Sequence, residues 1–243
     1  MQEPALPNSS ARDPFAERIA VVPGTVRWTA GPAPGVQRIV LDAGEGSNGR
    51  LTAFMRFAPG ARCTEHAHEG GEEILVLAGT LADERGVHRA GTYLRNAPGS
   101  RHAPASPDGC TIFVKLRQFA DGDVGSRLVD TRRVRWSRGR VPQTSVMPLH
   151  AFGDELTRLV HWRAGIGGAP VRHSGGAELL VLDGEFSDEH GHYGPGTWMR
   201  LPPGCWHRPR AGRRGVLAWV KTGHLRVLAR DPDRSERVAE AAA

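Results

Sequence analysis

Short apolar segments alternate with turns rich in glycine and proline along this chain of 243 residues. In the segment 50–57 (RLTAFMRF) every second residue is apolar, which places Leu51, Ala53, Met55 and Phe57 on one face. A period of two is typical of a strand with one buried face. Similar segments recur at intervals of roughly ten residues, a spacing that favours an all-β sandwich or barrel. They are 26–28, 36–41, 72–79, 88–96 and 110–119.

The second half of the chain repeats the first. A shift of 105 residues superposes AGTLADERGVHRAGTYLR (78–95) on DGEFSDEHGHYGPGTWMR (183–200) without a gap. The same shift pairs RLTAFMRF with ELTRLVHW, GGEEILVLAG with GGAELLVLDG, and PGSRH with PGCWH. A fixed internal period of this length indicates two copies of one domain in tandem.

The repeat also predicts where the domains begin and end. We expect a first domain at 21–122 and a second at 131–229, joined by a linker at 123–130. Residues 1–20 are polar and contain proline, so we expect an arm with at most a short helix near its end. Residues 230–243 are expected to form a C-terminal tail.

Composition and charge exclude several classes of function. The net charge is +6, but only Lys115 and Lys221 are lysines and no nucleic-acid-binding motif is present, so we do not expect nucleic-acid binding. No apolar run approaches the roughly 20 residues of a membrane span and no signal peptide is recognisable, which predicts a cytoplasmic protein without membrane contact. The three cysteines, Cys63, Cys110 and Cys205, lie far apart and predict no disulfide framework.

One group of residues has the character of a metal site. His66 and His68 form a His-x-His triplet, and alternate residues of a strand face the same side. Glu72 follows two glycines, and His102 ends the turn-rich sequence APGSRH, which could return to the same sheet. Imidazoles with one carboxylate suit borderline divalent metals such as Zn, Fe(II), Mn or Ni. The spacing makes these four residues candidate metal ligands.

The same spacing resembles the cupin superfamily. Its first motif is matched in full by Gly60, His66, His68, Glu72 and Gly79. Its second motif is matched by Gly91, Gly99 and His102, with Ala97 and Ser106 where proline and asparagine are usual. The amino-acid sequence of residues 66–104 is similar to that of the ChrR-type cupins. That branch includes the cupin half of zinc-dependent anti-sigma factors and some iron-dependent dioxygenases that cleave rings or diketones.

The resemblance implies a fold and a cofactor. The fold would be a bicupin, that is, two double-stranded β-helix (jelly-roll) domains in tandem. One divalent metal would be held in the N-terminal domain by His66, His68, Glu72 and His102. Zn and Fe(II) are the first candidates, and Ni and Mn are the others.

The second domain keeps only part of this ligand set. The shift of 105 residues maps His68 to His173 and His102 to His207, but His66 to Val171 and Glu72 to Ala177. His173 and His207 are therefore a remnant of a second site, with too few donors and no carboxylate for tight metal binding. We expect a structural domain in which aromatic residues fill the former pocket, with a metal-free ligand pocket as the alternative. Those aromatic residues are Trp162, Phe186, Trp198 and Trp206.

Two more residues of the first domain are candidates for a substrate pocket. Tyr93 follows the metal motif and could face the cavity, and its counterpart in the second half is Trp198. Arg95 recurs as Arg200, which also suits a structural ion pair.

Two functions from different classes fit the resemblance. The first is metal-dependent chemistry of the dioxygenase type on a small molecule, in the diketone or hydroxyaryl ketone class. The second is a metal-binding sensor related to the cupin half of the ChrR anti-sigma factors. Sigma-factor binding is not expected, because the His-x-x-x-Cys-x-x-Cys zinc motif of those proteins is missing. A homodimer is compatible with either function on fold-level analogy.

Overall fold

The periodic segments form strands in both halves of the chain. The computed structural model describes residues 15–44 and 49–230. The strands of the first half are β2 (Thr29–Ala30), β3 (Val36–Ala43), β4 (Leu51–Phe57), β5 (Ala61–Arg62), β6 (His66–His68), β7 (Glu72–Asp83), β8 (Gly86–Arg89), β9 (Thr92–Asn96), β10 (Ser100–His102), β11 (Ala105–Ser106), β12 (Cys110–Leu116) and β13 (Arg127–Asp130). The strands of the second half are β14 (Ser137–Arg138), β15 (Thr144–Phe152), β16 (Glu155–Trp162), β17 (Val171–Arg172), β18 (Ala177–Asp188), β19 (Gly191–Tyr193), β20 (Trp198–Leu201), β21 (Trp206–His207) and β22 (Arg210–Thr222). Strand β1 (Ile19–Val21) precedes both sets, and helix α1 (His224–Arg230) ends the described chain.

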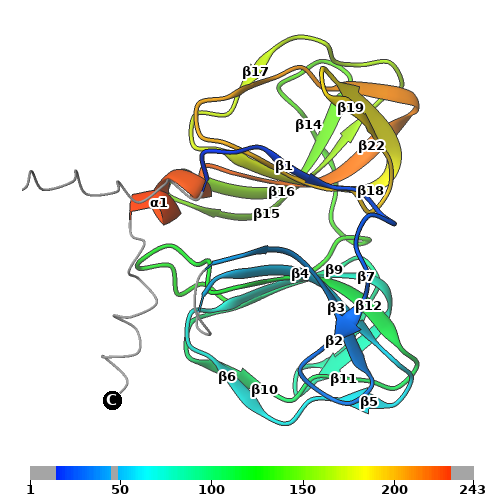
Figure 1. The fold of residues 1–243 in the computed structure, drawn as a ribbon, viewed down its shortest axis with the longest axis vertical. Helices are drawn as coiled ribbons and strands as arrows, with labels where there is room; N and C mark the ends of the chain where they lie inside the picture. Colours follow the sequence, from blue (N-terminus) through cyan, green and yellow to red (C-terminus); the bar gives the residue numbers. More distant parts are fainter. Residues whose placement is uncertain (1–14, 45–48, 231–243) are drawn as a thin grey trace, which may run out of the picture.

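The strands build two domains with the same topology, stacked one above the other in Figure 1. The first large sheet has the order β13-β9-β7-β12-β4-β3-β2, and the second has the equivalent order β1-β20-β18-β22-β16-β15-β14. Each domain adds a separate two-stranded pair, β6–β10 in the first and β17–β21 in the second. The all-β prediction is confirmed. The expected strand at 26–28 is absent, and the first strand after β1 begins at Thr29.

The two domains exchange their leading strands. Strand β1 precedes the first domain but pairs with β20 of the second, and β13 precedes the second domain but pairs with β9 of the first. The end of the expected arm is therefore a strand rather than a helix, and the expected linker supplies β13. Residues 1–14 and 231–243 lie outside the described residues. Each exchanged strand covers a sheet edge that would otherwise expose unpaired backbone groups.

A hydrophobic cluster joins the two large sheets face to face. Equivalent residues of the two repeats meet there, since Phe113 and Trp219 lie with ring centroids 5.0 Å apart. The buried members of the cluster are Leu41, Leu75, Tyr93, Phe113, Met147, Leu149, Leu159, Leu180, Trp198 and Trp219. Both domains contribute to this cluster, so the burial that stabilises one also stabilises the other.

Buried ion pairs cross the same interface. Lys115 Nζ donates to Glu178 Oε2 at 2.5 Å, and Lys221 Nζ donates to Glu73 Oε2 at 2.7 Å. These two pairs are equivalent in the two repeats, and their lysines are the only lysines of the chain. Both lysines have an exposed fraction of 1% or less. A buried charge needs a partner, which explains why both lysines sit opposite a carboxylate.

Acidification is expected to weaken this interface. Burial alone would raise the pKa of Glu73, but the charges of Lys221 and Arg95 outweigh it and lower the pKa from 4.5 to about 2. Because the folded-state pKa is lowered, the stabilisation is present above about pH 4.5 and is lost as the pH falls toward 2; it is on the order of 3 kcal/mol. Urea unfolding at stepped pH should therefore show a steeper loss of stability in this window for the wild type than for Glu73→Gln. Equal slopes would contradict the prediction.

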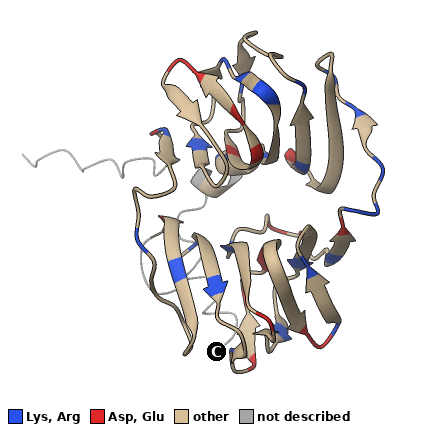
Figure 2. Ribbon diagram, turned by 90° about the vertical axis from the view of Figure 1, so that its right-hand side faces the viewer, with Lys and Arg blue, Asp and Glu red and all other residues tan. Residues whose placement is uncertain are grey.

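Charged residues do not gather on one domain. In Figure 2 basic and acidic residues are interspersed over both domains in that view. Among the described residues there is no helix with the length and apolar character that a membrane crossing requires. All three cysteines are free thiols.

Candidate metal centre

Two short strands and the start of a long one place the four predicted ligands at one end of the first domain. His66 and His68 project from β6 to the same side, and His102 on β10 lies directly opposite His66 in the strand register. Gly71 adopts a left-handed backbone with φ of 76°, which turns the chain so that Glu72 starts β7 beside the histidines. All four residues line one cavity. The structure brings together the set that the sequence predicted.

The donor atoms of these residues converge. The Nε2 atoms of His68 and His102 lie 2.8 Å apart. Glu72 Oε2 lies 3.3 Å from His68 Nε2 and 3.4 Å from His102 Nε2. Each of the three histidines offers a ring nitrogen within 4.8 Å of the others.

This arrangement fits a metal ion. Ligand bonds of about 2.0–2.2 Å place neighbouring donors about 3 Å apart around an octahedral ion and about 3.4 Å apart around a tetrahedral one. The separations between His68, His102 and Glu72 fall close to these values. Without an ion, the lone pairs of two imidazole nitrogens and a carboxylate oxygen would repel one another at these distances, unless protons lay between them. Three nitrogens and one oxygen are a donor set for Zn, Fe(II), Mn or Ni.

Neighbouring groups orient the ligands. His66 Nδ1 lies 2.8 Å from the carbonyl oxygen of Thr64. Asn96 Nδ2 donates to Glu72 Oε2 at 2.8 Å, and Asp83 Oδ2 faces His102 Nδ1 at 3.8 Å. Contacts of this kind orient the ligands.

Sequence reasoning missed Asn96 and Asp83. The internal repeat could have indicated Asp83, because it aligns this residue with a second aspartate, Asp188. In the structure Asp188 lies 3.0 Å from His207 Nε2. The repeat could not have indicated Asn96, because its counterpart in the second half is Leu201.

The electrostatics of the site favour neutral imidazole at His68. Burial, followed by the charges of His102, His66 and Arg117, lowers the pKa of His68 to about 3. Burial would also lower the pKa of His102, but the Asp83 and Glu72 carboxylates outweigh it and raise the value. A neutral imidazole has a free lone pair, which is the form that binds metals.

A cavity of about 380 Å³ lies over the four residues. Most of its wall is apolar, and its polar lining includes Arg38 and Arg117 besides the candidate ligands. Cys63 also lines the cavity, and burial, followed by the Glu72 charge, raises the pKa of its thiol. The apolar lining consists mainly of Pro32, Ala33, Leu51, Met55, Phe57, Ile74, Leu81, Pro104, Ile112 and Leu116. A pocket of this size and character suits a small organic molecule.

Comparison with known proteins identifies the family. The model of the ChrR cupin-like domain matches the chain twice, over residues 16–120 and 124–226. The chain belongs to the ChrR cupin-like domain family. The predicted bicupin fold is thereby confirmed. No curated protein sequence matches the chain significantly.

Solved structures with the same fold are distant in sequence from this ChrR-type bicupin. A "putative dioxygenase" from Nostoc punctiforme is 14% identical with a TM-score of 0.71, covering 86% of this chain and 84% of that one. A "putative glyoxylate induced protein" from Pseudomonas aeruginosa is 17% identical with a TM-score of 0.69, covering 90% and 92%. Oxalate decarboxylase from Bacillus subtilis, which has Mn(II) centres, is 11% identical with a TM-score of 0.59, covering 84% and 76%. At these identities the likeness shows the fold alone.

The substrate-pocket assignment of Tyr93 and Arg95 needs correction in this ChrR-type bicupin. Neither residue lines the cavity. The Tyr93 hydroxyl donates to Glu73 at 2.7 Å, and Arg95 forms a buried ion pair with Asp123. Both side chains lie on the face of the sheet that packs against the second domain. Asn96, which contacts the candidate ligand Glu72, follows Arg95 directly in β9. Consecutive residues of a strand point to opposite sides of the sheet, so Arg95 and Tyr93 point away from the candidate metal centre.

The second domain of the bicupin lacks a comparable site. His173 and His207 remain near each other, with ring centroids 5.7 Å apart, but His207 Nε2 is turned to Asp188 at 3.0 Å. Val171 has an exposed fraction of 40% and offers no donor. The described residues therefore show only two imidazoles at the position where the first domain has four donors.

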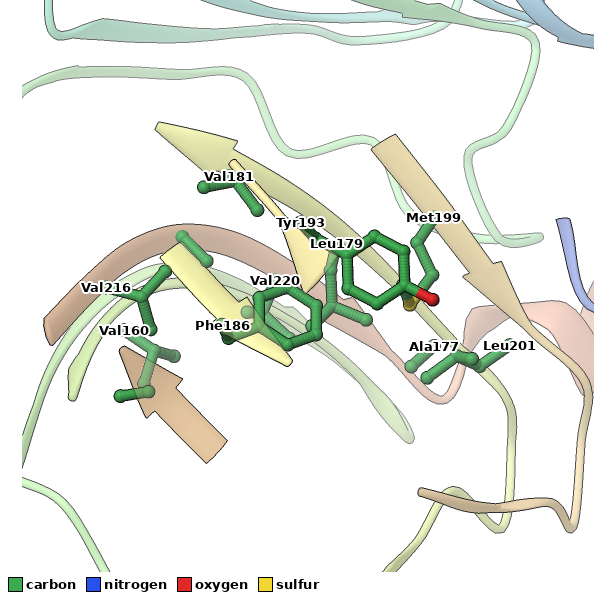
Figure 3. Packing of buried hydrophobic residues seen from close by; sticks show 12 residues of the cluster. Val160, Ala177, Leu179, Val181, Phe186, Tyr193, Met199, Leu201, Val216 and Val220 are labelled. Atoms are coloured by element: carbon green, nitrogen blue, oxygen red, sulfur yellow. The ribbon is translucent and has the colours of Figure 1, made fainter. Parts of the chain in front are cut away.

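Hydrophobic side chains fill the interior of the second domain. Phe186 and Tyr193 lie close together in Figure 3, with ring centroids 5.0 Å apart. Trp162 packs against the same cluster as expected. The other two predicted fillers do not, since Trp198 belongs to the interface between the domains and Trp206 has an exposed fraction of 62%.

One more buried group of potential ligands lies at the interface between the domains. Asp123, His150 and Glu155 are close enough to share an ion. The two carboxylates of this group already have cationic partners, because Arg95 pairs with Asp123 and Lys221 Nζ lies 2.7 Å from Glu155 Oε1. The group is therefore accounted for as part of the buried ionic network.

Proposed function

We propose that the first domain holds a mononuclear metal centre, and that this centre carries out dioxygenase-type chemistry on a small molecule of the diketone or hydroxyaryl ketone class. His66, His68, Glu72 and His102 would hold one divalent ion. The convergence of the three histidine donors, with Glu72 Oε2 beside His68 and His102, at the end of a largely apolar cavity supports the proposal most directly. A metal of this kind supplies Lewis acidity and, if it is Fe(II), reactivity toward oxygen.

The surrounding residues have distinct tasks in this proposal. Four protein donors leave up to two positions of an octahedral ion for a substrate that binds through two oxygens. Apolar walls hold the body of the substrate and exclude water. Asn96 donates to Glu72 Oε2, so this carboxylate serves as an oriented ligand rather than as a free base.

A metal-binding sensor is the second candidate, because the family match is to the cupin-like domain of ChrR. In this function the metal or a small ligand would change a surface that a partner protein reads. The two candidates differ in the metal and in oxygen consumption.

Elemental analysis of protein purified without a metal-affinity tag tests the proposal. We expect about one metal per chain, since one domain has the complete ligand set. Iron, followed by oxygen uptake with diketones or hydroxyaryl ketones, would support the dioxygenase-type function. Zinc without oxygen uptake, also after reconstitution with Fe(II), would favour the sensor. Two metals per chain would contradict the assignment of a single site, and a metal-free protein that also fails to take up added metal would overturn the proposal.

A further inference from the structure

Two arginines reach the cavity over the candidate metal centre. Arg38 comes from the middle of β3, and Arg117 comes directly after the end of β12. Both line the cavity together with the four candidate ligands. Strands far apart in the sequence therefore direct two cationic side chains into one largely apolar pocket.

Neither guanidinium is in an ion pair within the part of the chain that the structure describes. No ion pair or side-chain hydrogen bond joins Arg38 or Arg117 to a described residue, and the Nε atom of Arg38 is buried without a hydrogen-bond partner. Glu69 also lines the cavity but is exposed to water. A buried donor without a partner costs free energy, so an acceptor supplied by a ligand would be favourable there.

The backbone at Arg117 is held in an unfavourable conformation. Its φ is 56°, in the left-handed region, and only one other described residue that is not glycine has a positive φ. Its N–H donates to the carbonyl of Gly71 at 3.0 Å, which fixes this geometry beside the metal ligands. Strain of this kind persists where the surrounding structure imposes it and is frequent at functional sites.

The second domain provides an internal comparison. Gly223 occupies the position equivalent to Arg117, with φ of 88° and its N–H bonded to the carbonyl of Gly176 at 3.1 Å. The same backbone turn is thus built with glycine, which adopts it without strain. Arg38 pairs with Met55, and the equivalent pair in the second domain is Val146 with Val160. The half with the incomplete ligand set therefore also lacks both cavity arginines.

We infer that the cavity binds a small organic anion, with a carboxylate whose charge is offset by Arg38 and Arg117 and an apolar body held by the cavity walls. This inference rests on the proposed function and narrows its substrate class to a keto or diketo acid rather than a neutral diketone. Glu69 and Glu72 balance the two arginines in formal charge, so a divalent metal leaves the site with two positive charges in excess. Arginine forms strong, geometrically specific hydrogen bonds with carboxylates.

Calorimetric titration of the full chain loaded with zinc, which does not react with oxygen, tests this inference. The probes are acetylpyruvate and its methyl ester, which share the diketone unit and differ in the carboxylate. We expect the acid to bind at least about tenfold more tightly than the ester. Arg38→Val and Arg117→Gly, which copy the second domain, should weaken binding of the acid by about ten- to a hundredfold and leave the ester unchanged. Arg213→Ala, which removes an exposed arginine outside the cavity, is the matched control.

Parallel measurements separate failure of this inference from failure of the proposed function. Metal content is determined for every variant, and benzoate and benzamide are titrated into the metal-free protein, where a weaker preference for benzoate should remain. The inference is overturned, while the metal centre stands, if the zinc form retains its metal but binds acetylpyruvate and its methyl ester alike. The same holds if the carboxylate is preferred neither in that pair nor in the pair of benzoate and benzamide. If the chain binds no metal, the proposed function fails, and the benzoate preference alone decides the role of the arginines.

Discussion

Glu72→Gln and His66→Ala are each expected to abolish stoichiometric metal binding, whereas His173→Ala is expected to leave the metal content at about one per chain. Each of the first two changes removes one of the four candidate ligands, and Glu72 is also the only carboxylate among them. Loss of a residue that merely orients a ligand already costs about 10- to 100-fold in metal affinity, so loss of a ligand should cost more. Metal content after dialysis and zinc affinity by competition with a chelator measure the effect.

The His173→Ala variant is the matched control, because His173 is the counterpart of His68 in the other domain. Its ring lies beside His207, but Val171 and Ala177 stand where a third and a fourth donor would be needed. Circular dichroism should show the same strand content for all three variants. An equal loss of metal from His173→Ala would contradict the division into one metal centre and one remnant.

The sequence predicted that the four candidate ligands come together, because these residues are tied to local features. His66 and His68 share a face by strand alternation, and Glu72 directly follows Gly71, which turns the chain with a left-handed backbone. His102 required a long-range assumption, and the family spacing supplied it. The internal repeat then identified the second domain as the incomplete copy.

The assignment of Tyr93 failed for a physical reason. Strand alternation shows which residues share a face but not which face lines the cavity, and all five residues of β9 are buried. One face of β9 looks into the first domain and the other packs on the second domain, so no polar side marks the difference. The exchange of β1 and β13 was equally hidden, because edge pairing depends on where the two domains meet.

Lys221→Met is expected to destabilise both domains together. Lys221 Nζ lies 2.7 Å from Glu73 Oε2 and 2.7 Å from Glu155 Oε1, and the lysine has an exposed fraction of 0%. Removing it leaves two buried carboxylates that retain Arg95, at 3.6 and 3.5 Å, and the hydrogen bond from Tyr93 to Glu73. Breaking a buried ion pair costs about 3–5 kcal/mol, which corresponds to a loss of about 6–20 °C in Tm for a chain of this size.

Two further variants separate the buried charge from general damage to packing. In Lys221→Met with Glu73→Gln and Glu155→Gln, no charge is left without a partner, so part of the lost stability should return, because a neutral replacement of a buried pair is frequently tolerated. Arg133→Met removes an exposed partner of Asp130 and should change the free energy of unfolding by less than about 1 kcal/mol. Thermal unfolding followed by tryptophan fluorescence and calorimetry should show one shifted transition for Lys221→Met. An unchanged Tm, or a shift confined to the second domain, would mean that the ionic network does not couple the two cupin domains.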